Sequence, residues 1–378
     1  MSEFKSSSFR NEDNSGAPDI VGVSTFTSPY YFVPPSGTTA ERPSGDGLAP
    51  GMLRFNTDIG RLEVWRGDHW ATILGQESAP LGARGVIAGG DTTGAGADTN
   101  VIQYITLSTT GNSADFGDLI RNQRHVCGNV ASTTRGLFGG GYKSGSAGTN
   151  TIEYITISTL GNSIDFGDRA GGSTWSWGGL SNSTRGLWVG SSGIPGNSNV
   201  IDFITIASTG NSQSFGNHLI TSRDVACLSS NTRGILAGEY TNDNTIGYVT
   251  IASTGNAVDF GDLTFSNPSG NTYNRATGSN GVRGVFGPHG ETPTGKYQYI
   301  TISTLGNSVN FGDALSSIAS ATGSSSPTRM FSCGGNSPAI TNSIDYITIT
   351  STGNAQDFGD LITTATTAGA LTNGHGGL

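Results

Sequence analysis

Arginine is the first residue whose type and spacing could do chemistry in this chain. An Arg-Gly pair, or Arg-Met in the last copy, precedes a short apolar run six times. Six guanidinium groups could bind an anion, but one arginine per repeat is more typical of a structural role. The five N–H donors of arginine suit hydrogen bonds to turn carbonyls. We predict this structural role for six residues: Arg84, Arg135, Arg185, Arg233, Arg283 and Arg329.

Carboxylates also recur, in a Phe-Gly-Asp string that follows each arginine by about 30 residues. A calcium site needs several oxygens that converge from one loop. The local Asp-Phe-Gly-Asp spacing, as in Asp115 to Asp118, supplies two at most. We therefore predict that these carboxylates cap turns and that they bind no metal. They are Asp118, Asp168, Asp262, Asp313 and Asp360, with Asn217 in the third copy.

The remaining nucleophiles and bases form no pattern. None of the five histidines recurs at the repeat spacing or has a partner at metal-ligand spacing. The three cysteines are far apart and odd in number, which favours buried thiols over disulfides. We therefore predict no catalytic residue, no cofactor and no metal site, and the chain is not expected to be an enzyme.

Charge and hydropathy exclude two classes of partner. The net charge is −9, whereas nucleic-acid binding needs clustered Lys and Arg. No apolar run approaches the ~18 residues that span a bilayer, so membrane insertion is not expected. The polar start of the chain, Met1 to Gly16, is unlike a secretory signal.

The elements that must hold these residues belong to a sixfold repeat. A Gly-Asn pair recurs every 45 to 51 residues, starting at Gly111, Gly161, Gly210, Gly255, Gly306 and Gly353. That period is typical of propeller blades. Four strands per repeat are predicted: strand a after the arginine, strand b at the Tyr-Ile-Thr-Ile segment, strand c at Phe-Gly-Asp, and a looser strand d. Gly-Gly pairs such as Gly89-Gly90 are expected to let inner strands approach. The prediction is an all-β, six-bladed propeller over residues 81–378.

The repeat resembles two kinds of known sequence. The apolar run that ends in glycines, followed by a Tyr strand and an aromatic strand, resembles a divergent kelch repeat. It departs from kelch in strand c, where Phe116 and its equivalents stand in place of Trp. The Tyr-Ile-Thr-Ile-Ser-Thr-Leu-Gly-Asn and Asp-Phe-Gly-Asp strings of residues 84–378 are similar to those of glycine-rich virion structural proteins in marine and cyanobacterial tailed phages. This resemblance implies a virion component, made in the host cytoplasm.

Residues 1–80 are different in character and are expected to be a virion anchor. A polar arm and a strand-like stretch, Ile20 to Pro35, lead into a Pro/Gly/Ser linker, Ser36 to Pro50. Met52 to Trp65 predicts a β-hairpin that turns at Asn56–Gly60. It resembles the Arg-Phe-Asn-Thr-Asp module of phage tail-fibre and baseplate proteins. Because a lone hairpin is barely stable, its apolar residues should bury against the propeller, a second subunit or a virion neighbour. These residues are Leu53, Phe55, Leu62, Val64, Trp65 and Trp70.

The loops of the repeats predict where binding occurs. The b–c and d–a turns are nearly uniform, whereas the a–b and c–d loops differ in every repeat. Binding usually resides in individual loops on a rigid scaffold, although loops also drift freely. We expect a tail-fibre or baseplate adhesion or accessory protein, homo-oligomeric in the particle, that contacts a host glycan or protein. The alternatives are a capsid-surface decoration protein, a glycan-active propeller enzyme and a cellular kelch-type module. The predicted contact residues are Tyr142, Trp175, Tyr240, Phe265 and Tyr273.

Overall fold

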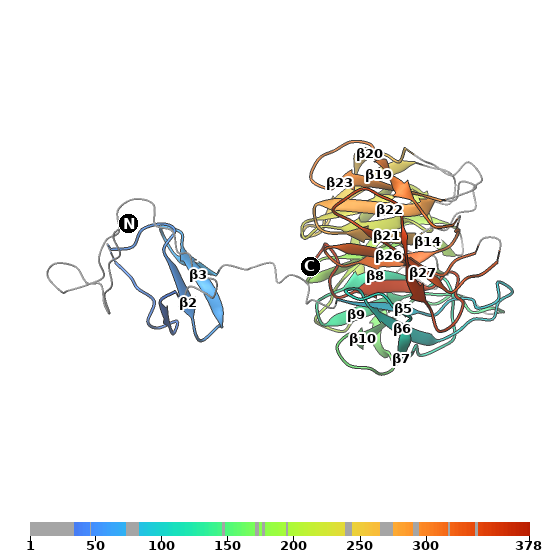
Figure 1. Ribbon diagram of the computed structural model, residues 1–378, viewed down its shortest axis with the longest axis horizontal. Coiled ribbons are helices and arrows are strands. Elements are labelled where there is room, and N and C mark those ends of the chain that lie inside the picture. Colours follow the sequence, from blue (N-terminus) through green and yellow to red (C-terminus); the bar gives the residue numbers. More distant parts are fainter. Residues whose placement is uncertain are drawn as a thin grey trace, which may run out of the picture. The chain divides into compact units, whose positions relative to one another are not determined.

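The computed structural model describes residues 34–45, 47–72, 83–145, 148–170, 174–175, 178–193, 196–238, 244–264, 275–289, 295–316, 318–336 and 339–378. The predicted all-β class is confirmed, because every regular element in these ranges is a strand. Accordingly, the described residues contain no helix of the length and hydropathy that a membrane span requires. The chain divides into two compact units, Met1–Gln76 and Glu77–Leu378, which are described separately (Figure 1).

The smaller unit is a four-stranded sheet in the order β1-β2-β3-β4. Its strands are β1 (Ser36–Gly37), β2 (Leu53–Asn56), β3 (Arg61–Trp65) and β4 (Trp70–Thr72). The pairing of Asn56 with Arg61 confirms the predicted hairpin turn. The segment predicted as a linker is in part structured, because β1 adds in parallel to β2. A backbone that can pair with a free strand edge gains hydrogen bonds that Pro/Gly/Ser composition alone does not reveal.

The larger unit repeats the predicted strands six times. The a strands are β5 (Arg84–Ala88), β9 (Arg135–Gly139), β14 (Arg185–Gly193), β18 (Arg233–Ala237), β22 (Arg283–His289) and β26 (Arg329–Cys333). The b strands are β6 (Val101–Thr106), β10 (Thr151–Thr156), β15 (Ser198–Thr205), β19 (Thr245–Thr250), β23 (Lys296–Thr301) and β27 (Ser343–Thr348). The c strands are β7 (Ala114–Asp118), β11 (Ile164–Asp168), β16 (Gln213–Ser222), β20 (Val258–Asp262), β24 (Val309–Asp313) and β28 (Gln356–Asp360). The d strands are β8 (Cys127–Ala131), β13 (Gly178–Ser181), β17 (Ala226–Ser229), β21 (Arg275–Ser279), β25 (Thr322–Ser325) and β29 (Gly369–Thr372), and a short β12 (Thr174–Trp175) pairs with the end of β14.

Strand d pairs with the a strand of the following repeat, and not within its own repeat as its sequence order suggests. The sheet β8-β9-β10-β11 is an example, and β21 and β25 also pair in parallel, which joins two such sheets into one of eight strands. The last d strand, β29, pairs with β5 of the first repeat. The six d strands contact their neighbours in the cycle β8, β13, β17, β21, β25, β29 and back to β8. The repeats therefore close on themselves, and the d strands surround an axis.

Glycines in the d strands allow this close approach. A Cβ atom on Gly128 would overlap the backbone of Ala370 in β29, and one on Gly179 would overlap the carbonyl oxygen of Gly128. The Gly-Gly pairs predicted for this role lie elsewhere. Gly89 and Gly90 follow strand a and approach the backbone of Gln123 and Thr366. The repeats predicted that glycine lets the inner strands approach, but not which glycines do so. Strand d, which holds them, is the least regular strand in sequence.

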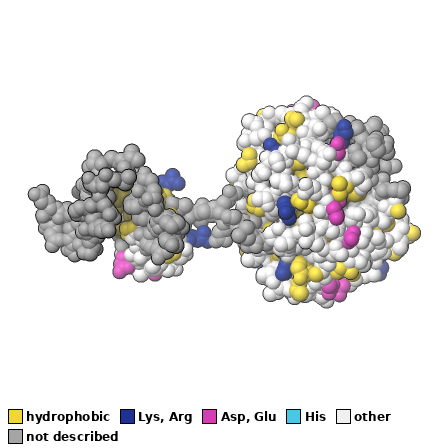
Figure 2. Space-filling model, in the orientation of Figure 1, with side chains coloured by type: hydrophobic (Ala, Val, Ile, Leu, Met, Phe, Trp, Pro, Cys, Tyr) yellow, Lys and Arg dark blue, Asp and Glu magenta, His cyan; other side chains and the backbone are white. Residues whose placement is uncertain are grey.

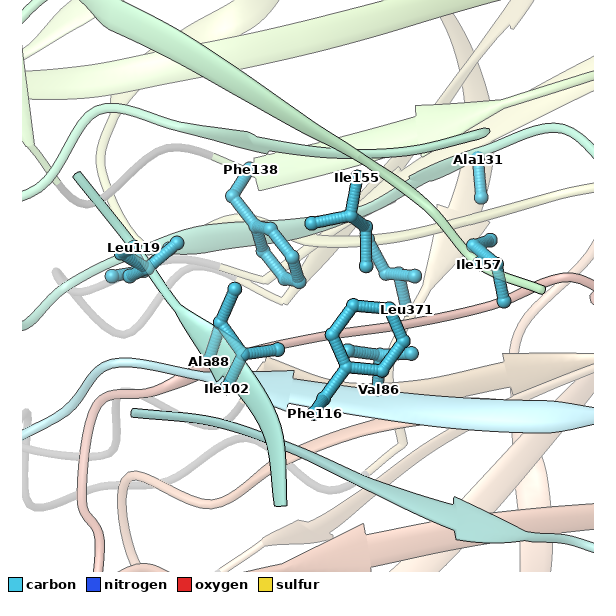
Figure 3. Packing of buried hydrophobic residues seen from close by; sticks show 11 residues of the cluster. Val86, Ala88, Ile102, Phe116, Leu119, Ala131, Phe138, Ile155, Ile157 and Leu371 are labelled. Carbon is cyan, nitrogen blue, oxygen red and sulfur yellow. The ribbon is translucent and has the colours of Figure 1, made fainter. Parts of the chain in front are cut away.

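The hydrophobic core lies between successive sheets. In Figure 3, Val86, Ile102 and Phe116 of the first repeat face Phe138 and Ile155 of the second. The six strand-c phenylalanines are 2–4% exposed, as expected for residues packed between repeats. Each contacts the aromatic residue of its own strand b edge-on, with ring centroids 5.9–6.2 Å apart. This geometry is favoured by the ring quadrupoles.

The antiparallel order d-a-b-c gives the unit two distinct ends. The b–c and d–a turns share one end, here called the turn end, and the a–b and c–d connections share the other, the loop end. Arg84, where the first strand a begins, and the last residue of β29 are both at the turn end. Figure 1 shows the C-terminus there, at the left-hand ends of the strands. The surface in Figure 2 is mostly uncharged, as the low content of charged residues implies.

Candidate binding face

The repeated arginines hydrogen-bond within the fold, as predicted. Each donates one Nη1–H to the backbone carbonyl at the end of strand b in the next repeat, at 2.7–2.9 Å. The last of these bonds runs from Arg329 to Leu107, and so it joins the sixth repeat to the first. Each guanidinium also stacks on the aromatic ring of its own strand b, with Cζ 4.4–4.6 Å from the centroid. The arginines thus link neighbouring sheets.

The Phe-Gly-Asp and Gly-Asn strings bind each other across every repeat boundary. At the first boundary, Gly161 N–H donates to the Phe116 carbonyl at 2.8 Å, and Asp118 N–H donates to Asn162 Oδ1 at 3.0 Å. The Ser163 N–H completes the set by donating to the Asp118 carbonyl. The same three bonds recur at all six boundaries, including the one between repeats six and one. The predicted capping by the carboxylates is not what these bonds show, because they use the asparagine side chain and the backbone of the aspartate.

The arginine bonds occupy the recurring groups of the turn end, whereas the loop end carries side chains that differ between repeats. The clearest of these is a network around Arg124, which precedes β8. Its Nη1 is 2.8 Å from Asp91 Oδ2, its Nε is 3.7 Å from Asp98 Oδ1, and its Cζ lies 5.2 Å from the ring centroid of Tyr142. The Tyr142 and Arg124 backbones also exchange both hydrogen bonds. Tyr142, a predicted contact residue, is thus held in place and half-buried.

Asp91 organises the loop that carries this network. Burial raises the pKa of its carboxyl group, but N–H donors from Thr93, Gly96 and Gly94, together with Arg124, outweigh burial and lower the pKa overall. Asp98 Oδ2 accepts the Ser144 N–H from the a–b loop of the second repeat, and so it connects two loops. The arrangement suits a rigid contact surface, since Arg124 is held by two aspartates and the tyrosine ring remains partly accessible.

A second loop-end group was not predicted from the sequence. Arg169 and Asp202 are each 2% exposed, and Arg169 Nε is 2.5 Å from Asp202 Oδ2. The guanidinium also donates to the carbonyls of Gly190 and Val200, which fixes the long β14–β15 hairpin. The departure of the second repeat from the others, with Arg169 after the Phe-Gly-Asp string, was the available signal.

A third group is a buried polar residue just before the aromatic residue of strand b. Glu153 accepts hydrogen bonds from Ser163 Oγ at 2.6 Å and from the Ile120 N–H at 2.9 Å. Gln103 and Gln298 do the same with their own partners. In the sixth repeat Asp345 is one methylene shorter, and Ala355 replaces the serine. Burial first, and then the charge of Asp357, raise the pKa of Asp345 to about 6.

The predicted anchor residues of the smaller unit lie on both faces of its sheet. Leu53 pairs with Val64 and Phe55 with Leu62, so these four share one face, on which Leu53 is 44% and Phe55 36% exposed. The other face buries the Glu63 carboxylate against Arg54 and Arg42. The Arg42 hydrogen bond is the main cause that lowers the pKa of Glu63.

The two anchor tryptophans lie on that charged face. Their ring centroids are 5.6 Å apart, and the Arg54 guanidinium lies over Trp70. Trp70 Nε1 donates to the Pro43 carbonyl at 3.0 Å, so this face is packed against the segment that precedes the hairpin. Successive side chains of a strand point to opposite faces of the sheet, and so the six predicted anchor residues are divided between the apolar face and the charged face.

Other predicted contact residues can be placed only in part. The backbone of Trp175 lies in β12, beside the loop-end extension of β14, which places it at the loop end but outside strand d. Tyr240, Phe265 and Tyr273 lie outside the described residues. The three cysteines are buried, and no disulfide joins them. Within the described ranges, no three His, Cys, Asp or Glu side chains gather as a metal site would require.

Comparison with known proteins gives no further assignment: no family model and no curated protein matches the chain.

Proposed function

We propose that the larger unit is a six-bladed β-propeller of the kelch-like type. Three features support this. The repeats close in a cycle, each contributes four antiparallel strands, and the d strands surround a common axis. Six blades lie within the range of 4–8 that propellers use. The last strand of the chain completes the first blade, and this closure joins the two ends of the unit.

We further propose that the protein is a non-catalytic structural protein of a phage virion, with an adhesion or accessory role in the tail fibre or baseplate. The observation that carries the proposal is the difference between the two ends of the unit. At the turn end the recurring arginines bond to the next repeat, whereas the loop end holds networks that differ between repeats, such as the one around Arg124. Individual loops on a rigid frame are suited to specific binding.

The partners follow from the same features. Residues 1–80 would bind other virion proteins, and the apolar face of Leu53, Phe55, Leu62 and Val64 offers a surface for that contact. Because the first strand a begins at the turn end, the chain enters the unit opposite to its loops. A loop end with Tyr142 would then contact a host glycan or protein. We also propose that the protein is made in the host cytoplasm and forms homo-oligomers in the particle.

Mass spectrometry of purified virions tests whether the protein is a virion component, and absence of the protein from virions would refute this.

The adhesion role is tested by Tyr142→Ala in particles that retain normal amounts of the protein. We expect weaker attachment to host cells, with Thr133→Ala at the turn end as the matched control. Unchanged attachment together with antibody labelling of the capsid would assign the decoration role instead. Release of sugars from host polysaccharide by the purified protein would indicate an enzyme.

A further inference from the structure

The C-terminal segment Asn373–Leu378 fills the turn end of the axis. After β29, the chain bends inward across the ends of the d strands and is mostly buried. His375 Nε2 lies 3.1 Å from the carbonyl oxygen of Ala131 in β8 and 3.2 Å from Ser181 Oγ in β13. The segment therefore contacts blades other than the one to which β29 belongs.

The bonds around His375 define its protonation state. Gly377 N–H donates to Nδ1 at 3.1 Å, so Nδ1 must carry a lone pair. The proton of the neutral ring is therefore on Nε2, from which it is donated to the Ala131 carbonyl. Both ring nitrogens are thus used, and the side chain is 8% exposed. The site recognises an uncharged imidazole in one orientation.

The glycines after His375 are required by the space around them. A Cβ atom on Gly377 would overlap the carbonyl oxygen of Ser181. A Cβ atom on Gly376 would overlap the backbone nitrogen of Gly281, in the d–a turn that follows β21. Backbone that fits between strands only as glycine is typical of a shaped peptide site.

The surrounding wall is polar and prearranged. It is made by the last residues of the d strands, four of which (Ser181, Ser229, Ser325 and Thr372) donate their hydroxyl to the last carbonyl of the preceding d strand. Ser229 Oγ donates to the Ser181 carbonyl at 2.7 Å, and Ser325 Oγ donates to the Ser279 carbonyl at 2.9 Å. A small cavity beside His375 and Gly376 is lined by Leu180, Ser229, Thr277 and Ser279. Asn129 of β8 also lines this cavity, and its side chain contacts Thr277 of β21 across the axis.

We propose that the turn end of the axis is a peptide-binding socket, and that residues 373–378 are its tethered ligand. The ligand class is a short glycine-rich peptide with one neutral imidazole, Asn-Gly-His-Gly-Gly-Leu in this chain. The inference is independent of the virion proposal, because it depends only on the larger unit. In this proposal the turn end of the axis binds peptide, and any other ligand binds at the loop end.

The test uses the full chain with Gly377→Val, which should displace the segment, and Gly353→Val as control, because a Cβ atom on Gly353 meets no neighbour. Carboxypeptidase digestion followed by intact mass reports how accessible the segment is. We expect Leu378 to be released at least about tenfold faster from Gly377→Val than from the wild type or the control, which corresponds to about 1.4 kcal/mol. A fluorescent peptide of sequence Asn-Gly-His-Gly-Gly-Leu should then bind the variant saturably, one to one.

Three results would overturn the proposal. They are equal release of Leu378 from all three proteins, release without peptide binding, and equal binding of a peptide in which valine replaces the residue matching Gly377. Melting of each variant checks that it is folded. If Gly377→Val does not fold, His375→Ala serves in its place, because it removes both imidazole bonds without adding volume. The wild type should bind the peptide at least about tenfold more weakly than either variant, since its own segment competes at a high effective concentration.

Discussion

Single residues differ between repeats where their structural roles differ. The polar residue before the strand-b aromatic shows this best. Glu153 is long enough to reach the Ser163 hydroxyl in its own repeat and the Ile120 N–H across the repeat boundary. Asp345 stands at the same position without the matching serine, and its raised pKa records the unfavourable burial of its charge. The sixth repeat therefore contains a residue that ionises at a cost to stability.

Replacing Asp345 by Asn should stabilise the protein at neutral pH. The folded pKa of about 6 lies above the ordinary value of 3.8, so the folded state holds the proton more tightly. Stability from this group is fully present below about pH 4 and is lost as the pH rises through about 6. We expect Asp345→Asn to gain roughly 3 kcal/mol at pH 7.5 and little near pH 4, measured by urea unfolding. Asp259→Asn, an exposed carboxylate, should change stability by less than about 0.5 kcal/mol at both pH values. A gain independent of pH would contradict this account.

His375 should give the opposite dependence. Burial lowers its pKa to about 4 from an ordinary value of 6.5, whereas its bond to the Ala131 carbonyl acts in the other direction. The unfolded state therefore binds a proton first, and stability falls as the pH drops from about 6.5 to 4. His375→Gln should lose stability at pH 7. Between pH 6.5 and 4, however, its free energy of unfolding should fall by about 3 kcal/mol less than that of the wild type. Denaturation midpoints at half-unit pH steps measure the slope, and parallel curves for the two proteins would refute the assignment.

At the scale of elements, the contact between strand c and the next b–c turn is the unit that repeats. Gly117 and Gly161 both have φ near +150°, but they differ in surroundings. A Cβ atom on Gly117 would overlap the Gly161 carbonyl, whereas one on Gly161 meets nothing within 4 Å. Gly117→Ala should therefore cost about 3 kcal/mol, and Gly161→Ala only the backbone strain of about 1 kcal/mol. Thermal melting of the two variants compares them, and equal losses would show that the contact is not tight.

The strand-c phenylalanine is the apolar counterpart of this contact. Phe166 is 2% exposed and packs with Trp188 and Tyr154 between the second and third repeats. Phe166→Ala should cost about 3–5 kcal/mol, because the fixed strands around it leave a cavity. A loss below about 1 kcal/mol by denaturant melting would contradict this packing.

How much of this was predictable follows from where the repeat is regular. Recurring residues predicted strands a, b and c, the buried phenylalanines and the arginine bonds. Each repeat is independent evidence for the same structural role. Strand d recurs weakly, so its pairing with the following strand a was missed. The loop-end groups, Arg124 with its two aspartates and Arg169 with Asp202, occur once each. Contacts between residues far apart in sequence and present in one copy leave no pattern that a single sequence can reveal.

At the scale of the whole molecule, closure turns six repeats into one cooperative unit. Within the chain, a d–a turn side chain accepts the N–H of the next arginine, as Ser132 does from Arg135 and Asn182 does from Arg185. Asn373 accepts the Arg84 N–H at 2.9 Å in the same way, although about 290 residues separate them along the chain. Asn373 and Arg84 therefore occupy the places of a d–a turn between β29 and β5, but the chain is not continuous between them.

A circular permutation that restores this turn should fold faster. The permuted chain would run from Thr363 to Asn373, through one serine, and then from Ala83 to Ile362. The pairing of β29 with β5 becomes local, and the entropy of closing a loop of about 290 residues no longer opposes it. Refolding after dilution from urea should be at least about tenfold faster than for residues 83–378 in native order, since long-range pairing limits the rates of all-β proteins. The permuted chain lacks residues 374–378, so the reference is also measured without them. Equal refolding rates would mean that another boundary between repeats forms last, and failure to fold would mean that the order of the strands is itself required for closure.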